Sequence, residues 1–296
     1  MRLKMFPKMR KINKPILITG SHRSGSTWVG KMLSLPVSVR YVSEPFNPGY
    51  GLKIFKSWFK YIKDDDSRYS LPISRALKFR GNYHLTLPAL KYFANNLCPL
   101  KKRPLVKDPI ACFSSAWLAQ KFDMDVVVLF RHPVAFYISL KRMDWHFDFK
   151  NLTNQPDLMI DYLHPLEDLI KKENKSFAQE AAILWLCIYH VLDIYITQNS
   201  DWIVKRHEDI SNDPVGEFED LYDKLGLEFT GRIEKKIKKH SSGGKEKSDK
   251  ALNLNRVSTN ISKEWTNKVS QEEIDIIKNI TGDLADKYYK KEDWNE

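Results

Sequence analysis

The sequence predicts an α/β protein with a P-loop-like, three-layer fold in which helices flank a central parallel sheet. Short apolar, β-branched runs at 15–19, 125–130 and 202–205 are separated by stretches of helical character. Strands that alternate with helices form parallel sheets, because parallel neighbours need a long crossover connection. A glycine-containing loop at 20–27 joins the first run to a helix, an arrangement that binds phosphate groups.

The amino-terminal elements follow from local patterns. Pro15–Thr19 is short and apolar and meets Gly20 at once, so we expect a buried strand that enters a turn, with a helix over Thr27–Leu35. Asp125–Phe130 has the same apolar character and predicts a second buried strand. The stretch Val134–Arg142 then reads as a helix.

The carboxyl-terminal half continues the alternation. Trp202–Lys205 is a third strand, followed by a helix over Pro214–Leu225, and Leu105–Val106 is a short fourth strand. The apolar stretch Ala181–Ile196 is interrupted by His and Asp, which indicates a buried helix and not a membrane span. Ser270–Glu273 forms a capping box that opens the last helix.

Composition limits the kinds of partner and compartment. A net charge of +11 favours anionic partners such as nucleotides, nucleic acids, acidic glycans or a membrane surface. The 3 cysteines include no CxxC pair, which argues against a disulfide framework or a cysteine zinc site. Residues 1–14 form a basic extension without the apolar core of a secretory signal, so we expect a cytoplasmic protein. We expect one domain over 1–296, with a mobile loop at 235–255.

The loop at 20–27 has the spacing of a P-loop, but Ser26 stands where the P-loop lysine would be. That lysine contacts the β- and γ-phosphates of a nucleoside triphosphate. The strand at 125–130 ends in Arg131, where a magnesium-binding site would need an Asp. The loop therefore suits a phosphate but not a magnesium-bound triphosphate, and its cation is Arg23. A phosphosulfate carries one charge fewer at its transferring end, so positioned cations and N–H groups can replace the metal.

The segment SHRSGSTW, residues 21–28, resembles the 5′-phosphosulfate-binding loop of sulfotransferases that use 3′-phosphoadenosine 5′-phosphosulfate (PAPS). Arg23 takes the basic position, as in carbohydrate-modifying members of that family. The resemblance implies that the remaining donor-binding positions of the loop are filled by Ser24, Gly25, Ser26, Thr27 and, against the adenine, Trp28.

A second motif of the same family follows the strand at 125–130. The resemblance implies that Arg131 and Ser139, eight residues apart, bind the 3′-phosphate of the donor, and an Arg fork suits a phosphate. His207 takes a position that contacts adenine, although a partly exposed surface histidine is equally compatible. Arg256, near Ser258 and Trp265, resembles the family's carboxyl-terminal 3′-phosphate segment.

Sulfuryl transfer needs a general base for the acceptor hydroxyl, and two carboxylates compete for that role. Glu44, the first choice, lies in an EP motif similar to that of carbohydrate sulfotransferases, and as a base it would need partial burial to raise its pKa toward neutrality. Asp108 stands where cytosolic members carry a catalytic His, and it is the second choice. Lys107 would stabilise oxygen atoms of the transferring group, although a strand-end lysine in an ordinary salt bridge is equally compatible. His22 and His132 flank the donor motifs and remain further alternatives.

The acceptor is not encoded in a motif. Stretches 46–100 and 143–176 follow strand ends, where loops of an open sheet form the ligand crevice, and we expect them to be acceptor-side insertions. Their aromatic and polar residues would suit sugar stacking or ordinary packing. The residues concerned are Tyr50, Trp58, Tyr83, Trp145 and His146.

The resulting hypothesis is metal-independent, in-line transfer of a sulfuryl group from PAPS to a hydroxyl or amine of a carbohydrate or glycoconjugate. We expect a cytoplasmic enzyme that does not bind nucleic acid and that contacts the inner membrane face peripherally. The alternatives are a P-loop kinase-like nucleotide-binding enzyme and a non-catalytic binder of polyanions. Ser26 and the missing metal Asp argue against the first, and only the net charge supports the second.

Overall fold

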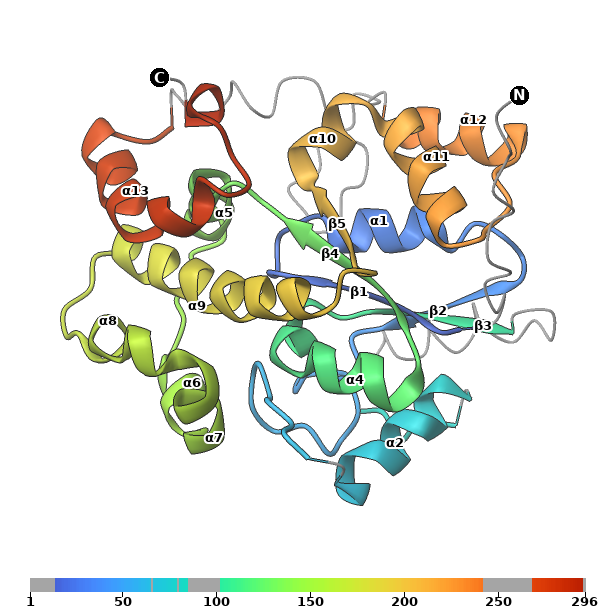
Figure 1. The fold of residues 1–296 in the computed structure, drawn as a ribbon, viewed down its shortest axis with the longest axis horizontal. Helices are drawn as coiled ribbons and strands as arrows, with labels where there is room; N and C mark the ends of the chain where they lie inside the picture. Colours follow the sequence, from blue (N-terminus) through green and yellow to red (C-terminus); the bar gives the residue numbers. More distant parts are fainter. Residues whose placement is uncertain (1–13, 65, 79, 85–101, 242–267, 295–296) are drawn as a thin grey trace, which may run out of the picture.

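The computed structural model describes residues 14–64, 66–78, 80–84, 102–241 and 268–294. Within them, a five-stranded sheet with the order β2-β3-β1-β4-β5 forms the centre of the protein (Figure 1). All neighbouring strands are parallel, which confirms the predicted fold class. The strands are β1 (Ile16–Gly20), β2 (Val39–Ser43), β3 (Arg103–Lys107), β4 (Asp125–Phe130) and β5 (Ile203–Arg206).

Helices cover both faces of the sheet, as the three-layer prediction requires. Alternate residues of β1 point to opposite faces: Leu17 belongs to one hydrophobic cluster, whereas Ile16 and Ile18 belong to the other. One face is covered by α4 (Ser115–Phe122), α5 (Pro133–Lys141), α9 (Phe177–Gln198) and α13 (Gln271–Ala285). The other is covered by α1 (Ser26–Leu33), α10 (His207–Asn212), α11 (Pro214–Lys224) and α12 (Gly231–Ser241).

Smaller elements lie outside these layers. They are α2 (Ser67–Leu77), α6 (Lys150–Thr153), α7 (Pro156–Leu158) and α8 (Glu167–Lys171), with single turns η1 (Pro109–Ser114), η2 (Met159–Leu163), η3 (His164–Leu166) and η5 (Lys291–Trp294). The segment from α6 to α8, which leads into α9, lies below α9 in Figure 1.

Helix α9 is the buried helix that the sequence predicts. Its length and composition alone would allow it to cross a membrane, but most of its apolar stretch is buried within the protein. Trp185 and Tyr189 lie on it and are fully buried. It packs against α5 and α13, so it serves as a core helix.

Three features differ from the sequence prediction. Strand β2 was not expected, because only Val39 and Val42 are buried in it and an edge strand lacks a continuous apolar run. Helix α2 was also missed. The prediction of a mobile loop is wrong for residues 235–241, which belong to α12, because Ile233 and Ile237 bury one side of that helix. The capping box at Ser270 is confirmed at the start of α13.

Candidate active site

The predicted site residues gather at one edge of the sheet because each follows a strand. Strand β1 leads into the loop 20–27, Glu44 follows β2, and Asp108 follows β3. Arg131 follows β4 and His207 follows β5. The carboxyl ends of parallel strands lie at a common edge, and this is where open α/β sheets bind ligands.

The phosphate loop has a backbone that requires glycine at two points. Gly25 precedes α1 with φ 87°, and a Cβ there would lie 2.4 Å from Nδ1 of His207. Gly20 has φ 136°, and a Cβ there would lie 2.2 Å from the carbonyl oxygen of Leu129 on β4. Arg23 between them also has a positive φ of 67°. The loop is therefore tightly seated against β4 and against His207 at the start of α10, with its N–H groups at the start of α1.

Ser24 in the loop and Trp28 just after it each have a buried polar atom that could bond to a ligand. Among the residues that the structure describes, Oγ of Ser24 and Nε1 of Trp28 have no hydrogen-bond partner. Buried polar atoms in native proteins are nearly always paired. Hydrogen-bonding capacity is thus available where the sequence predicts the donor, and the loop is compatible with a phosphate-bearing ligand.

The structure brings together the residues predicted for the two ends of the donor. Nε of Arg23 donates to Oγ of Ser139 on α5 over 2.8 Å. Nη1 of Arg131 donates to the backbone carbonyl of Arg23, and the carbonyl of Arg131 accepts from Nε1 of Trp185 at 2.8 Å. Two guanidinium groups and a hydroxyl therefore form one cluster beside the loop, suited to a polyanion.

His207 is a buried part of the site and not a surface residue. It is 9% exposed, and its ring lies over Gly25 and against the edge of Trp28 at 6.2 Å between ring centroids. Trp28 in turn packs edge-on against Phe218 at 5.4 Å. The two aromatic residues predicted for the adenine side thus lie together.

Glu44 lies at the centre of a polar cluster. Lys107 donates to Oε1 of Glu44 and Tyr50 donates to Oε2, and both contacts are short. Asn47 also donates to Oε2, over 2.8 Å. Glu44 has a positive φ of 42°, which few non-glycine residues adopt, so the fold holds it in place at some conformational cost.

The expected upward shift of the Glu44 pKa is wrong for this arrangement. Burial acts to raise the pKa of Glu44, but the Lys107 ammonium and the hydrogen bonds from Lys107, Tyr50 and Asn47 hold it below its ordinary value. Burial likewise acts to lower the pKa of Lys107, and the neighbouring Tyr41 and Glu44 oxygens raise it above its ordinary value. The pair is therefore ionised at neutral pH.

Asp108 is occupied by the backbone. Its side chain is fully buried, with Oδ1 accepting from the N–H groups of Ile110 and Ala111 and Oδ2 accepting from the N–H of Phe46 at 2.7 Å. Burial and the Glu44 carboxylate raise the pKa of Asp108 to about 7, against the opposing effect of those hydrogen bonds and of Lys107. Asp108 thus joins the β2 and β3 loops, which is a structural role.

The two remaining histidines of the donor motifs differ in their surroundings. His22 lies among Phe59, Phe136 and Trp145, and burial beside Arg23 lowers its pKa to about 4. His132 is 3% exposed and caps α5, because its Nδ1 accepts from the next helical N–H at 3.3 Å. Burial lowers the pKa of His132 to about 3. Both rings are neutral at physiological pH.

The predicted acceptor-side aromatics divide into two groups. The first group lies at the site: the Arg23 guanidinium is 5.4 Å from the ring centroid of Trp145, and the hydroxyl of Tyr50 donates to Glu44. Trp58, Tyr83 and His146 have other contacts: the backbone N–H of Trp58 donates to Asn151, Tyr83 pairs with Leu52, and His146 contacts Glu180. Arg256 lies outside the described residues, as do Ser258 and Trp265.

Sequence reasoning missed three residues that support the site. Asn47 donates to Glu44, which lies only three positions earlier, so this contact could have been suggested by the short spacing of the two residues. Tyr189 on α9 bonds Ser21 of the loop at 2.9 Å. Glu208 accepts from the N–H of His132 and from the hydroxyl of Tyr289. The last two contacts span 168 and 76 or more residues and have no local signal.

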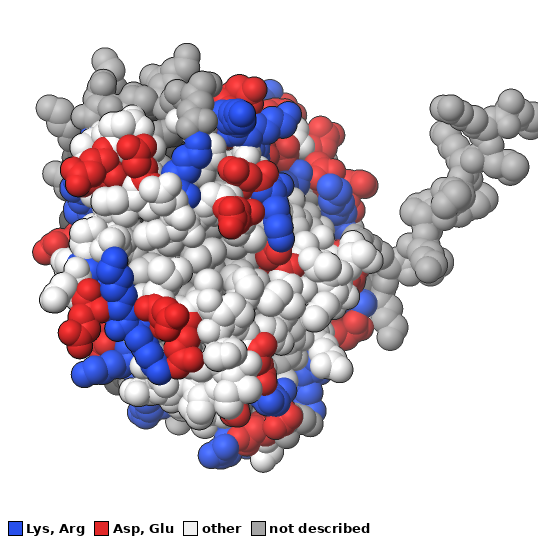
Figure 2. All heavy atoms as spheres, turned by 60° about the vertical axis from the view of Figure 1, so that its left-hand side comes forward, with Lys and Arg blue, Asp and Glu red and all other residues white. Residues whose placement is uncertain are grey.

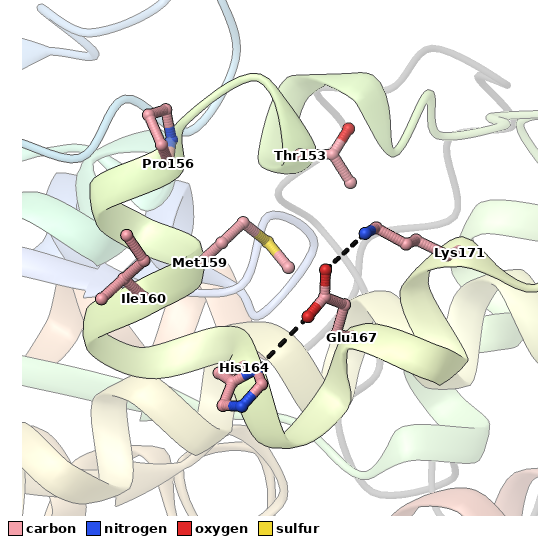
Figure 3. A pocket seen from close by; sticks show the side chains of 7 residues that line it. All are labelled: Thr153, Pro156, Met159, Ile160, His164, Glu167 and Lys171. Atoms are coloured by element: carbon pink, nitrogen blue, oxygen red, sulfur yellow. Dashed lines mark hydrogen bonds and ion pairs between the residues drawn. The ribbon is translucent and has the colours of Figure 1, made fainter.

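Other hollows and charges lie away from this edge. A cavity of about 470 Å³ in the stretch 143–176 is lined by Met159, Ile160 and an ion-paired trio of His164, Glu167 and Lys171 (Figure 3). On the face formed by α13, α9 and α8, positive and negative side chains are interspersed around an uncharged centre (Figure 2). In the described part of the chain, no three His, Cys, Asp or Glu side chains are grouped as metal ligands.

Comparisons with known proteins concern the family of the chain and its fold. A sequence model described as "Sulfotransferase family" matches residues 15–231. The fold resembles a sulfotransferase domain from the curacin biosynthetic pathway, with 14% identity, a TM-score of 0.52, and 92% and 98% of the two chains covered. It is also similar to mouse sulfotransferase SULT7A1 complexed with PAP, with 12% identity, a TM-score of 0.47, and 95% and 90% covered. The search of curated proteins found no match.

Proposed function

The chain belongs to the sulfotransferase family, and we propose that it takes a sulfuryl group from PAPS and places it on a hydroxyl or amine of a carbohydrate or glycoconjugate. Sulfuryl transfer is the family's activity, and the chain is a sulfotransferase.

One observation carries the choice of donor. Arg23, Arg131 and Ser139 form a single cluster beside a phosphate loop that has Ser26 in place of the P-loop lysine. A magnesium-bound triphosphate needs that lysine, whereas a nucleotide with phosphate groups on the 3′ and 5′ positions of one ribose needs two cations that lie near one another. The cluster and the resemblance of residues 21–28 to the family's donor loop support PAPS.

The chain's own residues account for binding and charge stabilisation. When bound, the donor supplies the sulfuryl group and leaves as 3′-phosphoadenosine 5′-phosphate (PAP). Arg23 and the N–H groups at the start of α1 would hold its 5′ end, and Arg131 with Ser139 its 3′-phosphate. Trp28 and His207 would pack against the adenine. Preorganised cations and N–H groups stabilise charge that develops on the leaving phosphate without having to reorganise.

Glu44 is our proposed general base. Its carboxylate is ionised, so it can accept the proton of an acceptor hydroxyl, and Lys107, Tyr50 and Asn47 fix its orientation. A proton that reaches Glu44 would weaken its pairing with Lys107. The Lys107 ammonium would then be available to stabilise negative charge at the transferring group. Asp108 is less suited, since its oxygens already accept three backbone hydrogen bonds.

Two features of the site support a carbohydrate acceptor. The basic residue of the loop is Arg23, as in carbohydrate-modifying members, and Trp145 lies beside it, 42% exposed. An exposed tryptophan beside hydroxyl-binding groups suits a sugar ring. We also propose a cytoplasmic location and no nucleic-acid partner. Screening glycans, phenols and steroids with labelled PAPS tests the acceptor class, and turnover of phenols alone would exclude it.

A calorimetric titration separates the donor proposal from its two alternatives. We expect PAP to bind without Mg²⁺ and far more tightly than AMP, because AMP lacks the 3′-phosphate. A P-loop kinase-like enzyme would instead prefer Mg–ATP. A polyanion binder would show no preference for PAP and would bind oligonucleotides with a steep salt dependence. Either of these results would refute the proposal.

A further inference from the structure

A second cavity lies at the opposite edge of the sheet from the active site. Its volume is about 540 Å³, and it is formed by the loop before β2, the start of β3, the turn after α11 and the first turns of α12. Leu35, Pro36, Leu227 and Ile233 supply apolar walls. The charged side chains of the lining are Lys102, Arg103, Arg232, Lys236 and one acid, Glu228.

Helix α12 presents a stripe of positive charge beside this cavity. Arg232, Lys235, Lys236 and Lys239 are spaced i, i+3, i+4 and i+7, so they share one side of the helix, and all four are exposed. Like charges at these spacings repel one another and destabilise a helix. Burial of Ile233 and Ile237 against the sheet layer holds the helix in place despite that repulsion.

Several of these cations lack a partner in the part of the chain that the structure describes. Among the described residues, the side chains of Lys102, Arg232, Lys235 and Lys236 form no ion pair or hydrogen bond. By contrast, Lys238 on the other side of α12 is paired with Glu234 at 2.6 Å. Within the described ranges, the charges of Arg232, Lys235 and Lys236 are therefore not compensated, and an external anionic partner would relieve their repulsion.

The apolar component indicates what kind of anion. Val37, next to Pro36 in the cavity wall, is 70% exposed, the second highest value among the large hydrophobic residues found exposed. The described residues that line the cavity include no aromatic side chain on which a nucleic-acid base could stack. Cations around an exposed aliphatic rim match a membrane, where anionic headgroups lie above hydrocarbon.

We propose that this face, formed by α12, Lys102 and the 35–38 loop, docks on an anionic membrane surface. The sequence that leads into the fold adds to the argument. Residues 1–13 contain Arg2, Lys4, Lys8, Arg10 and Lys11 and no Asp or Glu. The chain continues from them into Lys14, whose carbonyl accepts from Nε of Arg103 in the cavity wall at 2.7 Å. The sequence directly before Lys14 is therefore rich in basic residues, each of which adds to the attraction toward anionic lipids.

The geometry fixes the orientation that docking would give. The cavity lies at the amino ends of β2 and β3, whereas the active site lies at the carboxyl ends of the strands. Membrane contact through α12 would leave the donor and acceptor crevice open to solution. The docked enzyme would then act on acceptors that are soluble or that extend well beyond the headgroups.

Vesicle sedimentation of the full chain tests the proposal. We expect binding to vesicles of phosphatidylcholine mixed with phosphatidylglycerol at about 0.1 M salt and none to pure phosphatidylcholine, with binding lost as salt is raised. The double variant Arg232→Glu/Lys236→Glu should lower the partition coefficient by about thirty-fold or more, from roughly 1 kcal/mol per basic residue. The matched control, Lys150→Glu/Lys172→Glu, changes the same charge on exposed residues beside α6 and α8 and should have little effect.

PAP calorimetry on the same variants serves as the check on folding, since neither pair belongs to the donor site. Retained PAP affinity with lost vesicle binding supports the proposal. Equal vesicle binding by the two double variants would show that net charge alone acts and would overturn it. Binding of heparin or oligonucleotides without vesicle binding would also overturn it, in favour of a soluble polyanion. Only the folding check depends on the proposed donor, whereas the vesicle, heparin and oligonucleotide results do not.

Discussion

Replacing Gly25 with Ala would probe how the phosphate loop is held against His207 at the start of α10. A Cβ at this position lies 2.4 Å from Nδ1 of His207, about 1 Å inside ordinary contact, so the His207 ring must move. The backbone there has φ 87°, which costs Ala a further 1–2 kcal/mol, roughly, relative to Gly. With an overpacking penalty of about 1–3 kcal/mol, we expect Gly25→Ala to destabilise the fold by about 2–5 kcal/mol.

The double variant Gly25→Ala/His207→Ala separates the two contributions. Removing the imidazole relieves the contact but not the backbone strain, so Gly25→Ala should cost only about 1–2 kcal/mol in the His207→Ala background. Urea unfolding measures all four proteins, and PAP calorimetry should show that Gly25→Ala weakens binding less in that background. Equal effects of Gly25→Ala in both backgrounds would refute the idea that His207 is seated on the loop.

Three further predictions address catalysis, recognition and pH. Glu44→Gln should lower the rate of labelled sulfate transfer roughly 10²–10⁴-fold while PAP affinity stays within about threefold, and Asp108→Asn should lower it less; the reverse order would place the base at Asp108. Arg131→Ala should weaken PAP binding by about 2–3 kcal/mol and leave AMP nearly unaffected, and equal losses would mean that Arg131 acts only by holding the carbonyl of the neighbouring loop. Burial lowers the pKa of His132 from 6.5 to about 3 in the folded protein, so protons bind more readily to the unfolded chain. The stability that the neutral His132 contributes is fully present above pH 6.5 and is lost as the pH falls toward 3. Between pH 7.5 and 5 the loss of stability from His132 amounts to about 2 kcal/mol. His132→Asn keeps the helix cap but cannot titrate, so urea unfolding of this variant should lack that loss. The same pH-dependent loss in the variant and the parent protein would contradict the prediction.

The sequence was most informative where structure depends on near neighbours. The run at 125–130 matches β4 to the residue, because a short apolar, β-branched stretch can be satisfied only inside a sheet. The loop at 20–27 was recognisable because a positive φ demands glycine at fixed positions, as Gly25 shows. Edge strand β2 escaped notice, since a strand with one buried side and few apolar residues resembles a loop.

Motifs likewise indicated which residue types form the site, but they did not indicate the protonation or the hydrogen-bond partners of these residues. A base at Glu44 would need burial to raise its pKa, and burial does act in that direction. What reverses the outcome is the Lys107 ammonium, which lies 63 residues further along the chain. Asp108 shows the opposite case, since a carboxylate that looked available for catalysis is taken up by backbone N–H groups of two loops.

The sequence by itself thus determined the class of fold, the phosphate loop and the set of polar residues that follow the strands, because each depends on chemistry within a few positions. Only the tertiary structure decided which of those residues meet. Arg23 and Ser139 are 116 residues apart and reach one another because β1 and β4 are neighbours in the sheet. Strand order arises from the packing of the whole chain, and the charge on each side chain depends on the neighbours that this order supplies.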